Sequence, residues 1–136
     1  MMKVTELAKR TGVTPDVVRY YARIGLLKPA RHPDSGYRQF AEADVKRLQF
    51  IRRSQRLGFT LSEIAEIIHM SGKGKTPCPM VREIIQLRIR EIGSQLDELI
   101  ALHERMKRAL KQWKKMPDGV PDGHAICYLI ESVVDK

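Results

Sequence analysis

The stretch TPDVVRYYARIGLLKPARHPDSGYRQF, from Thr14 to Phe40, contains the signals that decide the fold. At its start, Thr14 can cap a helix in which Pro15 takes the first position. A shorter helix precedes it, with Thr5 as the expected cap and Gly12 as the stop signal. Two short helices joined by a turn that contains glycine are typical of a helix-turn-helix.

The second half of the stretch loses helical periodicity. Prolines and glycines interrupt it, and the turn 32–36 reads His-Pro-Asp-Ser-Gly. Leu26-Leu27 and the segment 37–40 are expected to form short strands on either side of that turn. The prediction is a β-hairpin, or wing, beside the helix-turn-helix.

Two more helices are expected after the wing. One runs from Glu42 to Leu57, and Thr60 caps the next. The residues expected to face inward on the first of these are Val45, Leu48, Phe50, Ile51 and Leu57.

A long helix is the strongest periodic signal in the chain. Its core positions alternate by four and three residues, as in a coiled-coil seam, and are apolar except for His103: Ile85, Ile89, Ile92, Leu96, Leu99, His103, Met106, Leu110 and Trp113. About 36 residues of helix extend roughly 54 Å, too far to bury the seam within one chain of this size. The seam therefore predicts a partner, most simply a second copy.

Together, these signals predict a mainly α-helical fold with three domains. They are a winged helix-turn-helix over 1–75, a dimerisation helix over 76–116, and a loop with a short terminal helix over 117–136. The last helix is expected within 127–134.

Charge is concentrated in the first of these domains. Of the 136 residues, 1–75 carry 15 basic and 7 acidic side chains, whereas 76–136 carry 10 and 9. A concentrated positive field suits a polyanion. No apolar run is long enough to cross a bilayer, and no catalytic constellation stands out, so we expect a soluble cytoplasmic protein that is not an enzyme.

Several motifs in the first 70 residues resemble the MerR family of bacterial transcription regulators. The family's R-[YF]-Y-x-x-x-G-L-L segment is present at 19–27 and its S-G-Y-R wing motif at 35–38. Its E-L-A and G-F-T-L-S-E-I segments stand at 6–8 and 58–64. The resemblance implies a homodimer on double-stranded promoter DNA, joined by antiparallel long helices. It also implies that an effector changes the dimer so that it distorts the promoter for RNA polymerase.

The candidate DNA contacts come from the second helix and the wing. Arg19 can donate two hydrogen bonds to a guanine edge, and Tyr37 and Arg38 can reach flanking phosphates. The full set is Thr14, Val17, Arg19, Tyr20, Tyr37 and Arg38. The alternative is that the tyrosines are core aromatics and Arg19 belongs to a surface ion pair. Tyr21 is expected in the core.

The two cysteines suggest a sensing site between chains. Cys78 begins the long helix and Cys127 follows its end, and the connecting residues are too short to return along a helix of roughly 54 Å. An antiparallel partner removes this difficulty. Metal-sensing members of the family bind their ion in the loop after the long helix and complete a divalent site with a cysteine from the partner.

The resemblance therefore implies a divalent metal ion held by Cys78 of one chain and His124 and Cys127 of the other. Zinc suits these ligands best, and cadmium, lead or mercury are alternatives. One further cysteine, usual in mercury and zinc sensors, is absent from 114–118, so Asp118, Asp122 or water is left as a fourth ligand. A redox switch that uses both cysteines without metal, and a DNA-binding dimer without an effector, stay open.

Overall fold

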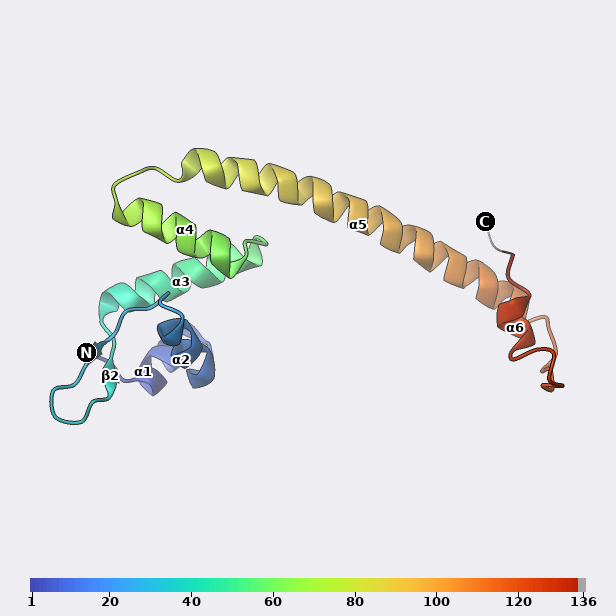
Figure 1. Ribbon diagram of the computed structural model, residues 1–136, viewed down its shortest axis with the longest axis horizontal. Helices are drawn as coiled ribbons and strands as arrows, with labels where there is room; N and C mark the ends of the chain where they lie inside the picture. The colour runs from blue at the N-terminus through green and yellow to red at the C-terminus, as the bar shows by residue number, and fades with distance from the viewer. Residues whose placement is uncertain (135–136) are drawn as a thin grey trace. The chain divides into compact units, whose positions relative to one another are not determined.

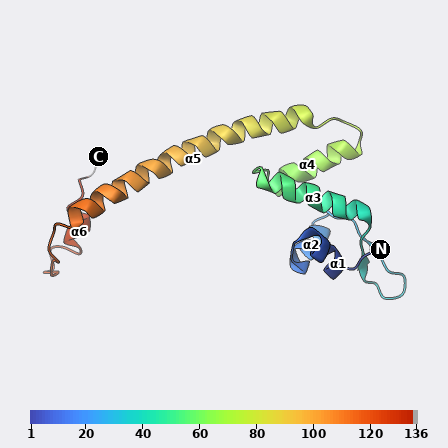
Figure 2. The same cartoon turned by 180° about the vertical axis from the view of Figure 1, so that it is seen from behind.

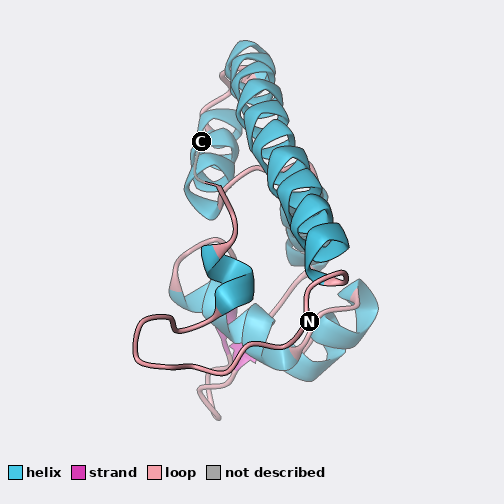
Figure 3. Cartoon of the chain, turned by 90° about the vertical axis from the view of Figure 1, so that its right-hand side faces the viewer, coloured by secondary structure: helices cyan, strands magenta, loops and turns pink. Residues whose placement is uncertain are grey.

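The computed structural model describes residues 1–134. They form six α-helices and one two-stranded antiparallel sheet (Figures 1, 2 and 3). The helices are α1 (Val4–Thr11), α2 (Pro15–Arg23), α3 (Glu42–Arg56), α4 (Leu61–Gly72), α5 (Cys78–Trp113) and α6 (Tyr128–Glu131), and the strands are β1 (Ala30–Arg31) and β2 (Arg38–Gln39). None of the described helices is both long and apolar enough to cross a bilayer.

By packing, the chain divides into two compact units between Arg88 and Ile89. The first unit contains α1 to α4, the hairpin and the first turns of α5. Those turns belong to it because Met80, Val81 and Ile84 pack against its core. The predicted division at residues 75 and 116 stays a prediction.

The helix-turn-helix forms as the sequence predicts. Helix α1 is followed by Gly12 in the left-handed region, with a φ of 73°. The hydroxyl of Thr14 caps α2 by accepting a hydrogen bond from the Val17 N–H at 3.3 Å. The expected cap at Thr5 is wrong. Helix α1 already begins at Val4, after a Lys3 cap position that makes no side-chain cap bond.

The wing forms, but its first strand lies later than predicted. Ala30 pairs with Gln39 and Arg31 with Arg38, so the prediction of a strand at Leu26-Leu27 is wrong. The backbone N–H groups of both leucines donate to the Tyr21 carbonyl, at 2.9 and 3.1 Å. These bonds close the end of α2 and turn the two side chains into the core, where both are buried.

One core joins the elements of the first unit. Its buried apolar residues are Met2, Leu7, Ala8, Val18, Tyr21, Leu26, Leu27, Phe40, Val45, Leu48, Ile51, Phe59, Ile64 and Ile67. Tyr21 is a core residue, as predicted. The inward prediction is wrong for Phe50 and Leu57, which are 37% and 60% exposed. Phe50 lies on the exposed side of α3, and Leu57 directly follows that helix.

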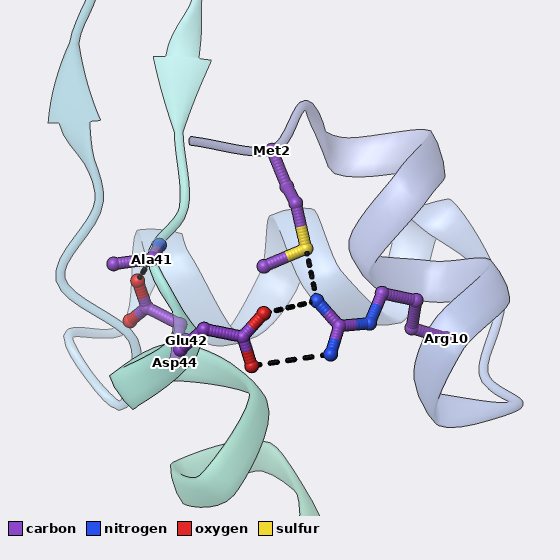
Figure 4. A network of polar contacts seen from close by, with 5 residues as sticks. All are labelled: Met2, Arg10, Ala41, Glu42 and Asp44. Carbon is purple, nitrogen blue, oxygen red and sulfur yellow. Dashed lines mark hydrogen bonds and ion pairs between the residues drawn. The ribbon is translucent and has the colours of Figure 1, made fainter.

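Polar contacts tie the chain start to α3 (Figure 4). Arg10 donates from both terminal nitrogens to the two carboxylate oxygens of Glu42, and Nη1 also lies 3.2 Å from the Met2 sulfur. The N–H of Ala41 donates to Oδ2 of Asp44 at 2.9 Å, which caps α3. Hydrogen bonding to Arg10 lowers the pKa of Glu42.

Helix α5 begins at Cys78, as expected, and its 36 residues match the predicted length. From Ile89 onward, six apolar positions of the predicted coiled-coil seam are exposed in the single chain, each between 51% and 65%: Ile89, Ile92, Leu96, Leu99, Met106 and Leu110. We call these six residues the seam. Trp113, the last predicted position, is half-buried. The terminal helix α6 is only four residues long, shorter than the predicted 127–134.

Candidate nucleic-acid interface and metal ligands

The recognition helix α2 presents polar groups on an exposed side. Thr14 and Arg19 are exposed, and Tyr20 is 41% exposed. The guanidinium of Arg23 lies 5.3 Å from the centre of the Tyr20 ring, a cation–π contact that orients that ring. Val17 is half-buried and packs against the core, so only part of its side chain remains for a contact outside.

Arg19 is held by a neighbour on its own helix. Its Nη1 donates to Oδ1 of Asp16 at 2.8 Å, and the side chains of Arg19 and Asp16 are 52% and 93% exposed. An exposed pair of this kind contributes only about 0–1 kcal/mol. The arginine can therefore exchange Asp16 for a base edge or a phosphate at little cost.

The wing turn is built by short-range hydrogen bonds. Nδ1 of His32 accepts from the N–H groups of Asp34 and Ser35, at 3.1 and 3.3 Å. Gly36 has a φ of 73°, a conformation that disfavours residues with a side chain. Nη1 of Arg31 donates to the Gly36 carbonyl at 2.8 Å and braces the turn.

A hollow of about 240 Å³ lies between the recognition helix and the wing. It is lined by Val4, Arg19, Arg31, Gly36, Tyr37 and Arg38. The structure thus brings together three predicted contacts, Arg19, Tyr37 and Arg38, whereas Thr14, Val17 and Tyr20 do not line this hollow. Three guanidinium groups with no carboxylate in the lining make a site suited to an anion such as a phosphate.

Arg31 was missed by sequence reasoning. Its position became informative only with the register of the hairpin, which places it directly opposite Arg38. A register one residue away would have put the two side chains on opposite faces. The signal available beforehand was the pair of arginines on either side of the wing turn.

The predicted metal ligands are accessible or close to the surface. Cys78 is an exposed free thiol at the first residue of α5, and Cys127 is a half-buried free thiol at the cap position of α6. His124 is exposed. Within residues 1–134 of a single chain, no three His, Cys, Asp or Glu side chains come together as a metal site. The predicted site, which needs two chains, stays a prediction.

Carboxylates hold the loop around Cys127 in place. The N–H of Cys127 donates to Oε2 of Glu131 at 3.0 Å. Asp122 accepts at Oδ1 from the His124 N–H and at Oδ2 from the Tyr128 hydroxyl, at 2.9 and 3.0 Å. Both hydrogen bonds lower the pKa of Asp122, and the one from the His124 N–H has the larger effect. Both oxygens of this candidate fourth ligand are therefore engaged within the loop.

The fold and the basic hollow define the class of the protein as a helix-turn-helix, DNA-binding regulator. Residues 2–71 match the family model described as MerR HTH family regulatory protein, and residues 45–109 match the one described as MerR, DNA binding. The chain belongs to the MerR family. It is a transcriptional regulator that binds DNA.

Relatives with known descriptions extend over most of the chain. The mercuric resistance operon regulatory protein of Bacillus cereus is 32% identical over an alignment of 136 positions, which covers 98% of each protein. A probable heavy metal-dependent transcriptional regulator of Haemophilus influenzae is 34% identical over 118 residues, covering 87% of this chain and 89% of the relative.

A solved structure gives the same fold. The regulator MerR of Bacillus megaterium MB1, in complex with mercury(II), is 33% identical. The match has a TM-score of 0.59 and covers 96% of this chain and 98% of that one.

Proposed function

We propose that the protein is a homodimeric, metal-responsive activator that distorts promoter DNA for RNA polymerase. The ion is divalent and is held by Cys78 of one chain and by His124 and Cys127 of its partner. Zinc is the favoured ion, with cadmium, lead or mercury as alternatives. Its action is binding rather than catalysis, and it works in the cytoplasm.

The observation that carries the proposal is the exposed seam. Six large apolar side chains on one helix stand more than half exposed, and burying each one fully would contribute about 1.5–3 kcal/mol. Their spacing of three and four residues is that of a helix that packs along another helix. A second copy offers the same seam, and a two-fold interface is the commonest way to cover one.

Antiparallel pairing of two such helices places the beginning of one beside the end of the other. Cys78 begins α5, and the loop with His124 and Cys127 follows its last turn. Two thiolates and one imidazole are ligands that zinc takes in tetrahedral sites. The descriptions of the three relatives above, which mention heavy metal, mercuric resistance or mercury(II), support a metal as the effector.

The effect on DNA follows from linkage. An ion can shift the dimer only if it binds one conformation more tightly than another. The conformation it selects has to bend or untwist the promoter, which costs on the order of 1–6 kcal/mol for a smooth bend. Zinc binding to structural sites in small peptides is worth about 10–16 kcal/mol, so a part of that free energy would be enough to select the bent conformation.

Zinc titration of the dimer tests the proposal, with and without a thiol reductant. Sub-micromolar zinc binding that Cys78→Ser and Cys127→Ser both abolish is the predicted result. A reductant-sensitive crosslink between the chains, without zinc binding, would assign the cysteines to a redox switch instead. Indifference to both zinc and reductant would leave a dimer that binds DNA without an effector.

A further inference from the structure

Arg88 links α5 to α4 inside the first compact unit. From the third turn of α5, its Nη2 donates to Oε1 of Glu63, near the start of α4. The side chains of Arg88 and Glu63 are only 23% and 25% exposed. Both side chains are more than 40% exposed in the Arg10–Glu42, Arg19–Asp16 and Lys107–Glu104 pairs. The pair is therefore better shielded from solvent than the surface ion pairs.

Hydrogen bonds at the start of α4 hold Glu63 in place independently of Arg88. The Thr60 N–H donates to Oε1 of Glu63 at 2.8 Å, and the Glu63 N–H donates to the Thr60 hydroxyl at 3.1 Å. This capping box holds the carboxylate at the start of α4. Hydrogen bonding, first from the Thr60 backbone and then from Arg88, lowers the pKa of Glu63. Arg88 thus binds an acceptor that is rigid and ionised.

The stem of Arg88 lies over the turn between α3 and α4. A Cβ added at Gly58 would stand 3.6 Å from Cγ of Arg88. Met80, Val81, Ile84 and Ile85 of α5 also pack against the core through apolar side chains. Apolar contacts hold the helix against the core but are non-directional, whereas a charge-assisted hydrogen bond also fixes its rotation.

We propose that Arg88 is the positioning residue that sets the direction in which α5 leaves the DNA-binding lobe, here meaning α1 to α4 with the wing. Arg88 is the last residue of the first unit, and α5 continues from it as the same helix. Of these contacts of α5 with the lobe, the one from Arg88 to Glu63 lies nearest in sequence to Ile89, so a change in the helix beyond Ile89 reaches it before the apolar contacts. The role in signalling rests on the proposed function.

Two substitutions at Arg88 separate its charge from its stem. Arg88→Met keeps an unbranched stem over Gly58 and removes the charge, while Arg88→Lys keeps both a stem and a charge. Arg90→Met is the matched control, because Arg90 is an exposed arginine of the same helix. Each purified dimer is bound to operator DNA labelled at both ends, and single-molecule energy transfer is recorded with and without Zn²⁺.

Arg88→Met is expected to bind the operator within about threefold of the unchanged protein but to lose more than half of the zinc-induced change in energy transfer. Arg88→Lys is expected to restore most of that change, and Arg90→Met to leave it intact. A full response in Arg88→Met would overturn the proposal. So would a loss of operator affinity in Arg88→Met as large as the loss of response, because that is the behaviour of a residue needed only for folding.

A measurement on the metal-free complex with DNA tests the role of Arg88 independently of metal sensing. The operator ends in the Arg88→Met complex are expected to show a broader distribution of distances than with Arg88→Lys, because the lobe is less firmly oriented. An unchanged width would overturn the positioning role. If the unchanged protein ignores zinc but Arg88→Met still broadens the distribution, the proposed function fails and the role of Arg88 stands.

Discussion

The ring of Tyr128 lies directly over Gly119, and the hydroxyl of Tyr128 donates to Oδ2 of Asp122 at 3.0 Å. A Cβ added at Gly119 would stand 2.2 Å from Cδ2 of that ring, much closer than any real contact. One aromatic residue thus closes the segment 117–127, which we call the tail loop and which contains His124.

Gly119→Ala is expected to open the tail loop, because the added methyl group displaces Tyr128 and breaks its bond to Asp122. Hydrogen exchange at the His124 amide, which donates to Asp122, should become faster. Val120→Ala is the control, since Val120 is 81% exposed. Unchanged protection of His124 in Gly119→Ala would contradict the packing described here.

Arg19→Ala is expected to weaken discrimination between operator and unrelated DNA by about 1–3 kcal/mol, the contribution of one bidentate base contact. Arg38→Ala should weaken binding to both kinds of DNA alike, because phosphate contacts carry no sequence information. Competition binding with the two DNAs measures both effects. Equal retention of operator preference in the two variants would contradict these roles.

Arg31→Ala should behave like Arg38→Ala, because Arg31 lines the same hollow and also braces the wing turn. The slope of log affinity for DNA against log salt concentration should become shallower in Arg31→Ala by about the amount that one phosphate contact contributes. Arg56→Ala, which removes an exposed arginine from the last turn of α3, is the control. An Arg31→Ala protein with the salt dependence of that control would show that the hollow does not bind phosphate.

Acid should remove the stabilisation that Glu63 provides. Its pKa is lowered in the folded state, so its ionised contacts stabilise the fold above the unfolded pKa, about 4.3, and are lost as the pH falls through the folded value. Glu63→Gln should cost about 1 kcal/mol of unfolding free energy at pH 7. Urea titrations at a series of pH values should show the difference in unfolding free energy between the two proteins shrinking as acid protonates Glu63, and a constant difference would rule out the ionised contacts as its source.

Leu99→Lys should shift the dimer toward single chains, because Leu99 is 62% exposed in the middle of the seam. A lysine there leaves a charge buried or separates the helices. Sedimentation measures the change, and Glu98→Lys, at an exposed neighbouring position, provides the comparison. A Leu99→Lys protein that stays as dimeric as Glu98→Lys would place the interface elsewhere.

Local signals in the sequence predicted much of the fold. Thr14 caps its helix, and Gly12 follows another. The apolar periodicity from Ile85 to Trp113 predicted the long helix α5. The misplaced first strand had a physical cause. The pair Leu26-Leu27 is apolar because it enters the core at the end of α2, and a short apolar run does not separate that role from a strand.

The candidate site was predicted less completely than the fold. Arg31 joins it only through the hairpin register, and the Arg19–Asp16 pair depends on side-chain positions that spacing permits but does not require. The sequence alone therefore did not show that Arg31 lines the hollow or that Arg19 pairs with Asp16. The metal ligands stay a prediction for a different reason, because their convergence depends on a second chain.

Mixing two inactive variants tests the shared metal site most directly. Alone, Cys78→Ser and Cys127→Ser dimers each lack one ligand at both sites. In a mixed dimer, one site loses both cysteines and the other keeps both, so exchange of chains should restore about a quarter of the zinc sites of the unchanged protein. Recovery at that level is the predicted result. Stable mixed dimers that bind no more zinc than either parent would contradict a site built from two antiparallel chains.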